Sequence, residues 1–268
     1  DFDEAADNIL LDQAGHYRVK ATTEIVDFNA AFGTQLSDEE LDNVGGTVIQ
    51  GGVEGDAQEP TRSVLYVSQG GIGLPDRDYY LKPDPKLQDI RAKYVAYVAQ
   101  MLDAAGVKNT KAAAAGVMAL ETSLARAHWT NVENRDAVKP YNRVPMKELA
   151  TRFPGMDWAA WTAELGVSDA PHIIVSQPSF FAALAKTVGA TPVEQWEAHL
   201  KFHAVDRFAP FLSSALVNAS LEFRGKTLQG IETLQPRWRR ALTGMDSTLG
   251  ELLGQVYVEV HFSPTAKA

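Results

Sequence analysis

The sequence contains no cysteine, and this absence narrows its chemistry at once. Without thiols the chain forms no disulfide bonds, holds no zinc through thiolates and has no cysteine nucleophile. It also lacks any run of about 18 apolar residues, the length that a membrane-spanning helix needs. No basic segment followed by an apolar one opens the chain, so we expect any leader or anchor to lie outside it.

Basic residues are in the minority, with 25 Lys and Arg against 34 Asp and Glu. The resulting net charge of −9 and pI near 5.2 disfavour non-specific binding to nucleic-acid phosphates. Hydrophobic residues make up 45% of the 268 positions, which is enough for one or two substantial cores. We therefore expect a globular protein without a nucleic-acid partner.

Glycine, proline, acids, a base and aromatic residues crowd into the segment 70–81. Its glycines permit positive φ and close backbone approach, and Pro75 fixes its own φ, so the chain must turn sharply here. Asp76 and Asp78 flank Arg77 and can accept hydrogen bonds from loop amides. We interpret the segment as a well-packed structural corner, and a functional loop is the alternative.

Four collinear blocks resemble hallmark segments of the neprilysin-like zinc metallopeptidases, the family of neprilysin, the endothelin-converting enzymes and bacterial oligopeptidase O. They are residues 68–81, 133–142, 223–228 and 235–259. The resemblance covers roughly residues 46–268, whereas residues 1–45 match nothing in it. It implies a mainly helical lobe that faces a zinc-bearing lobe across a closed cavity.

That family holds its zinc with His-Glu-x-x-His on one helix and a glutamate further along, and the glutamate of the motif is the general base. No His-Glu pair occurs among the six histidines of this chain. In the family the motif lies well downstream of the block that resembles 235–259. The resemblance therefore implies zinc in the full-length enzyme but none in this chain, and we expect no catalytic, cofactor-binding or metal-binding residue here.

One pair of histidines nevertheless has the spacing of a metal site. His199 and His203 stand four residues apart on a predicted helix, and Asp206 follows one turn later. The three side chains would make a conceivable zinc site, so a small independent metallohydrolase is one hypothesis. We favour the alternative that each His lies at the edge of a packed face, because Trp196 and other aromatics crowd this helix.

The remaining patterns predict a mainly α fold, a multi-helix lobe with a small β-hairpin near its N-terminal side. The hairpin is indicated by β-branched and aromatic residues at 47–49 and 63–67, separated by a turn-forming stretch. Apolar residues recur every three or four positions after Pro85, which predicts a long helix that stops at Gly106, and Thr110 caps the next. We expect further helices after Asp157, after Pro178, over 191–218 with a kink at Pro210, and over 236–260.

Two divisions of the chain follow from these patterns. Residues 1–45 form an unplaced N-terminal segment, for which we expect short helices and a helix start at 37–42. Residues 46–268 form the helical lobe. Within it, charges of alternating sign in 133–142 predict a salt-bridge network that pins the loop.

By resemblance, the chain is the non-catalytic helical part of a zinc metalloendopeptidase that acts on oligopeptides. It would shape and restrict access to the catalytic cavity, and it would not cleave peptides alone. Peptide substrates would then be bound through the catalytic half, in a periplasmic or extracellular location and with any membrane anchor outside this chain. The alternative function is a stand-alone helical module that binds peptides or proteins without catalysis.

Overall fold

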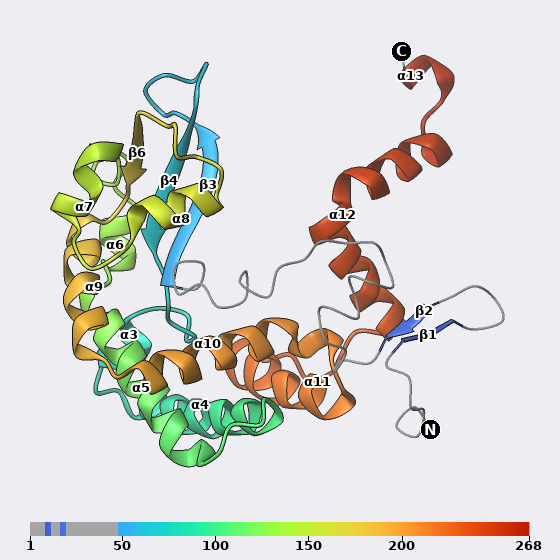
Figure 1. Ribbon diagram of the computed structural model, residues 1–268. Coiled ribbons are helices and arrows are strands. Elements are labelled where there is room, and N and C mark those ends of the chain that lie inside the picture. The colour runs from blue at the N-terminus through green and yellow to red at the C-terminus, as the bar shows by residue number, and fades with distance from the viewer. Residues whose placement is uncertain (1–8, 12–16, 20–47, 268) are drawn as a thin grey trace. The chain divides into compact units, whose positions relative to one another are not determined.

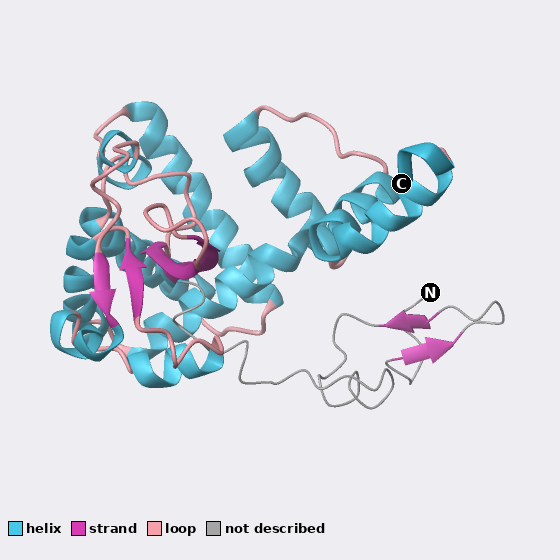
Figure 2. Ribbon diagram, turned by 90° about the horizontal axis from the view of Figure 1, so that it is seen from above, coloured by secondary structure: helices cyan, strands magenta, loops and turns pink. Residues whose placement is uncertain are grey.

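The computed structural model describes residues 9–11, 17–19 and 48–267. Helix is its main secondary structure, as predicted, and the strands are few and short (Figure 2). The chain divides into two compact units, Asp1–Arg207 and Phe208–Ala268, which are described separately below. No helix in the described ranges combines the length and the apolar character that crossing a membrane requires.

A small sheet lies near the start of the first unit, and its first two strands confirm the predicted hairpin. Strands β3 (Ile49–Gly55) and β4 (Ser63–Gln69) pair in antiparallel register, with Ile49 opposite Gln69. Two strands that the sequence analysis did not predict complete the sheet, β5 (Arg143–Pro145) and β6 (His172–Val175). The strand order is β3-β4-β6-β5, in which β6 runs parallel to β4 and antiparallel to β5.

Within residues 1–45 the structure describes one antiparallel strand pair, β1 (Ile9–Leu11) with β2 (Tyr17–Val19). These strands stand where the sequence analysis expected short helices. The predicted helix start at 37–42 lies outside the described residues.

The two long helices predicted after the corner are confirmed. Helix α3 (Asp78–Leu81) is a single turn, and α4 (Pro85–Ala104) follows with Asp84 as its N-cap, accepting hydrogen bonds from two backbone amides of the first turn. Helix α5 (Thr110–Ala127) begins one residue earlier than expected for a Thr110 cap, because Asn109 occupies the cap position with φ of 54°. Helices α3, α4 and α5 pack against one another.

Shorter helices surround the sheet and continue the first unit (Figure 1). Asp157 accepts a hydrogen bond from the amide of Ala160 and so caps α8, as predicted, and Pro178 opens α9. The elements are α6 (Asn131–Asn134), a 3-10 turn at Met146–Glu148, α7 (Leu149–Arg152), α8 (Trp158–Glu164), α9 (Pro178–Ala190) and α10 (Val193–Phe208).

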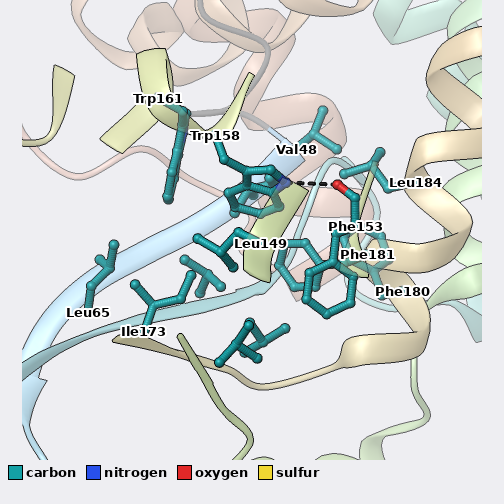
Figure 3. Packing of buried hydrophobic residues seen from close by; sticks show 14 of the residues in the cluster. Val48, Leu65, Leu149, Phe153, Trp158, Trp161, Ile173, Phe180, Phe181 and Leu184 are labelled. Atoms are coloured by element: carbon teal, nitrogen blue, oxygen red, sulfur yellow. Dashed lines mark hydrogen bonds between the residues drawn. The ribbon is translucent and has the colours of Figure 1, made fainter. Parts of the chain in front are cut away.

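Aromatic side chains from the helices pack on the sheet and form the main core (Figure 3). Trp158 is buried between Phe153 and Phe181, and its indole N–H donates to the Phe153 carbonyl over 2.8 Å. Trp161 lies over β3 at Gly51, where a Cβ atom would approach its ring to 3.6 Å. This distance is an ordinary van der Waals contact, so Trp161 packs closely on the strand at this position.

A second layer of the first unit joins α4, α5 and α10 around aromatic contacts. Phe202 of α10 meets Tyr94 and Tyr97 of α4 edge-on, with ring centroids 5.7 and 6.1 Å apart. Tyr94 and Phe202 are fully buried, so this contact fixes α10 against the helical pair.

The second unit begins where the sequence analysis expected only a kink. Helix α10 ends at Phe208, Pro210 lies in a 3-10 turn (η3, Ala209–Phe211), and Leu212 is extended. Proline has no N–H for the helix ladder, and here the chain leaves the helix instead of bending it. The remaining elements are α11 (Ser214–Ser220), a π-helical segment (η4, Leu221–Thr227), α12 (Arg237–His261) and α13 (Pro264–Lys267).

Candidate functional site

Helices α5 and α10 bring three ionisable side chains together inside the first unit. Glu121 comes from the middle of α5, and His199 and His203 come from successive turns of α10. One carboxylate oxygen and one imidazole nitrogen from each His all lie within 4.8 Å of one another. Glu121 and His199 are fully buried, and the side chain of His203 is 17% exposed.

The Glu121 carboxylate accepts hydrogen bonds from three directions. His203 Nε2 lies 2.8 Å from Oε1, and the hydroxyl groups of Tyr80 and Tyr94 donate to Oε2 over 2.6 and 2.8 Å. Tyr80 belongs to α3 and Tyr94 to α4. One carboxylate thus links α3, α4, α5 and α10, and we call these side chains, together with His199, the Glu121 cluster.

The glycine-rich corner closes over the Glu121 cluster. His199 Nε2 lies 2.9 Å from the Gly71 carbonyl oxygen, and the Tyr80 hydroxyl accepts a hydrogen bond from the amide of Leu74 over 2.8 Å. Gly71 has φ of 81°, and a Cβ atom at Gly73 would overlap the Tyr94 hydroxyl. The corner is therefore packed directly on the cluster, as the structural interpretation of this segment requires.

Electrostatics keep the Glu121 carboxylate ionised. Burial by itself raises the pKa of Glu121. His203, through its hydrogen bond and its charge, together with His199 and the Tyr80 hydroxyl, lowers the pKa by more than burial raises it, so the pKa lies below its usual value. The same burial, helped by Glu121, holds the pKa of Tyr80 well above 10. Burial and the charge of His203 lower the pKa of His199 to about 4, so His199 is neutral at pH 7.

The hydrogen bonds decide whether these residues fit a zinc ion. A carbonyl oxygen and an ionised carboxylate can only accept, so Nε2 of His199 and of His203 both carry a proton. Zinc needs the bare lone pair of an imidazole nitrogen, so a metal bound at Nε2 of either ring would have to displace these hydrogen bonds, whereas Nδ1 of His199 is buried without a hydrogen-bond partner. The residue types and their spacing are those of a metal site, and the hydrogen bonds at Nε2 and at the carboxylate compete with a metal there.

In the sequence analysis the helical spacing pointed to the two histidines of the cluster but not to Glu121. Asp206, offered there as the carboxylate partner, instead accepts a hydrogen bond from the Tyr97 hydroxyl over 2.5 Å. Glu121 takes its place. Its signal was present in the sequence, because it stands four residues after Val117 and three before Leu124 on a face that is otherwise apolar.

In the 133–142 block one ion pair forms where a network was predicted. Lys139 Nζ lies 3.3 Å from Glu133, whose hydrogen bonds with Thr130 lower its pKa to about 2. Thr130 and Glu133 form a capping box for α6. Asp136 instead caps the following turn, accepting from the amides of Val138 and Lys139.

The overlap at Gly73 gives a first prediction. Gly73→Ala should lower the free energy of unfolding by about 2 kcal/mol or more, since the added methyl must displace a buried and hydrogen-bonded tyrosine. Gly189→Ala is the control, because nothing lies within 4 Å of its Cβ position in α9 and alanine favours the helix. Urea unfolding measures the stability of both variants. If Gly73→Ala is as stable as Gly189→Ala, the corner accommodates the added methyl group and the prediction is wrong.

The buried neutral His199 predicts a pH dependence. Its folded pKa of about 4 lies below the ordinary 6.5, so the unfolded chain binds more protons between these values. Stability should be full above pH 6.5 and should fall by up to roughly 3 kcal/mol as pH drops towards 4. His199→Gln keeps a donor for Gly71 and should flatten this slope in urea unfolding. The exposed His261→Gln should leave it unchanged, and an unaltered slope in both variants would contradict the assignment.

The engaged ligand atoms predict that the purified chain holds no zinc. After dialysis, elemental analysis should find less than about a tenth of a zinc ion per chain. One zinc per chain that disappears in both His203→Ala and Glu121→Gln, but persists in His261→Ala, would contradict this prediction.

Comparison with known proteins identifies the relatives of this chain. The N-terminal model of Peptidase family M13 matches residues 9–268, and so reaches into the segment that the motifs left unplaced. Endothelin-converting enzyme 1 of Cavia porcellus is 23% identical over 80% of the chain, and membrane metallo-endopeptidase-like 1 of Mus musculus is 25% identical over 80%. The open-state structure of the Mycobacterium tuberculosis zinc metalloprotease Zmp1 superposes on 92% of the chain, with 33% identity and a TM-score of 0.78.

The chain spans 29% and 30% of the length of these two curated relatives and 38% of the Zmp1 chain. A structure of PepO from Lactobacillus rhamnosis, with 18% identity and a TM-score of 0.67, shares the fold. These matches confirm the neprilysin-like resemblance that the sequence blocks carry. The chain belongs to peptidase family M13.

Proposed function

We propose that this chain is the non-catalytic helical part of a zinc metalloendopeptidase that acts on oligopeptides. The observation that carries the proposal is the difference between the share of this chain that the family model matches and the share of its relatives that the chain spans. The family model matches residues 9–268, nearly the whole chain, yet the chain spans under two fifths of its relatives and contains no His-Glu pair. Zinc and the general base would then come from residues outside this sequence.

The chemistry of the described residues supports a non-catalytic role. The strongest cluster of ionisable groups is centred on Glu121, which is fully buried and saturated by hydrogen bonds. A general base must reach the proton that it removes, and this carboxylate cannot reach a substrate. Its role is to hold α3, α4, α5 and α10 in place.

A rigid helical lobe can select substrates by size. The aromatic core and the Glu121 cluster make the first unit a stiff body, in which α10 is fixed to both α4 and α5. A wall of this kind admits flexible peptides to a closed cavity and excludes folded proteins, which cannot deform to enter. We assign this restricting role to the chain.

An exposed apolar stripe on α12 supports the presence of a further packing partner. Large apolar side chains recur every three or four residues along α12, which is kinked at Leu249, and are between 43% and 67% exposed: Trp238, Leu242, Met245, Leu249, Leu252 and Val256. Such a stripe is the pattern by which a helix buries one face against a neighbour. The remaining part of a longer peptidase would supply that neighbour.

A stand-alone helical module that binds peptides or proteins is the second candidate. Such a module would have the same fold but no zinc-binding half. The exposed apolar stripe on α12 would then bind a separate protein. Reading the coding sequence beyond residue 268 separates the two. His-Glu-x-x-His within the next few hundred codons supports the peptidase, and a stop codon there supports the module.

The proposal also assigns surroundings and partners. Oligopeptides are the substrates, bound with the catalytic half, and the net charge of −9 argues against a nucleic-acid partner. Zmp1, a zinc metalloprotease, is the relative from which the zinc requirement is carried over. We assign a periplasmic or extracellular location, with any membrane anchor outside the sequence described.

The purified chain alone should hydrolyse no peptide. We expect quenched fluorescent oligopeptides to remain intact over hours with and without added zinc, because no described residue pairs a metal with an accessible base. If the coding sequence supplies a zinc half, the two parts expressed together are the positive control. Cleavage by the chain alone that a chelator abolishes would overturn the assignment.

A further inference from the structure

A polar pocket of about 320 Å³ lies in the first unit and is lined in part by the glycine-rich corner. Its walls come from segments far apart in the sequence: the end of β4 with the corner itself (68–77), the C-terminal end of α5 with α6 (128–134), and the single residues Gln50 and Gln177. Two of the four family-like blocks therefore meet in one pocket.

Hydrogen bonds between side-chain amides and the backbone hold these walls in place. The Gln69 side chain accepts from the Trp129 amide over 2.7 Å and donates to the Trp129 carbonyl over 3.3 Å. Gln177, which is buried, accepts from the Gln69 amide over 2.9 Å and donates to Asn134 over 3.2 Å. The polar wall is thus built before any ligand arrives, which lowers the entropy cost of binding.

The floor of the pocket is neutral. His128 Nε2 lies 2.8 Å from the Gly70 carbonyl, so this nitrogen carries the proton and donates. Burial lowers the pKa of His128, opposed by the Gly70 hydrogen bond, and the positive charge of Arg77 lowers it further. The charge of the pocket is therefore set by Asp76 and Arg77.

Asp76 is engaged within the pocket wall, whereas Arg77 is not. Asp76 accepts from the amide of Asp78 over 2.8 Å and from the Asn131 side chain over 3.0 Å. Asp78 pairs with Lys82 over 2.7 Å. Arg77 is the single Lys or Arg that lines the pocket, its Nε is buried without a hydrogen-bond partner, and none of the described carboxylates forms an ion pair with it.

A half-buried guanidinium without a carboxylate is a group that lacks its natural partner. Arginine presents a planar fork of donors that matches a carboxylate in two parallel hydrogen bonds. A volume of about 320 Å³ accommodates such a group with a residue or two of the molecule that bears it.

We propose that this pocket binds the carboxylate group of a peptide, with Arg77 as the cationic anchor. The identification of a peptide as the bearer rests on the proposed function, whereas the carboxylate follows from the pocket itself. The carboxylate comes from the peptide C-terminus or from an acidic side chain, and both sources offer Arg77 the same planar group.

Calorimetric titration of the purified chain at low salt tests the proposal. Acetyl-trialanine with a free C-terminus is compared with its C-terminal amide and with an amidated peptide that carries one Asp. At least one carboxylate-bearing peptide should bind at least about tenfold more tightly than the uncharged amide. Binding of the free acid alone identifies the terminus as the source, and binding of the Asp peptide identifies the side chain.

Variants assign the binding to Arg77. Arg77→Gln should weaken carboxylate binding at least about tenfold, and Arg77→Lys should keep part of it, because lysine retains the charge without the fork. Arg135→Gln is the matched control, since Arg135 is exposed and does not line the pocket. Circular dichroism verifies that each variant is folded.

Equal binding of acid and amide, or unchanged binding in a folded Arg77→Gln variant, would overturn the proposal. If Arg77→Gln does not fold, the folded Arg77→Lys variant decides. A reduced preference for the acid over the amide in Arg77→Lys supports the proposal, and an unchanged preference contradicts it. Carboxylate binding measured in this way is independent of catalysis. A chain that binds carboxylates but has no zinc half after residue 268 would keep this inference and refute the proposed peptidase.

Discussion

The buried carboxylate of Glu121 is the constraint on which the helical part of the first unit depends. An ionised group away from water is very costly unless hydrogen bonds and an opposite charge compensate for it. Here the compensation comes from Tyr80, Tyr94 and His203, one from each of three other helices. The chain cannot satisfy Glu121 without bringing α3, α4 and α10 to α5, so the charge specifies the packing that the apolar residues stabilise.

The same constraint explains the composition of the glycine-rich corner. His199 donates to the Gly71 carbonyl and Tyr80 accepts from the Leu74 amide, so the backbone itself completes the Glu121 cluster. A backbone that approaches side chains this closely leaves no room for a Cβ atom at Gly73, and the φ of 81° at Gly71 suits glycine. The segment that most resembles the family is thus determined on one side by packing.

The sequence was sufficient for the helices and the hairpin because both depend on local patterns. The helix after Pro85, the Asp157 cap of α8 and the β3-β4 hairpin follow from capping chemistry and periodicity. Strands β5 and β6 are only three and four residues long and pair with strands remote in sequence, so no local period indicates them. The role of Glu121 was missed for a related reason: its hydrogen-bond partners lie 27 to 82 residues away in the sequence, and only the fold brings them together.

The corner has a second face, and the two faces depend on each other. His128 and His199 donate to the adjacent carbonyls of Gly70 and Gly71, so the backbone between the cluster and the pocket is held by two buried imidazoles. Both donate while neutral, because burial lowers the pKa of each, and neither brings a charge to the pocket that could compete with Arg77. In the proposed pocket, a wall fixed in this way favours a ligand carboxylate over an internal partner for Arg77. The rigidity that Glu121 imposes on the helices is therefore also what keeps the guanidinium available to a ligand.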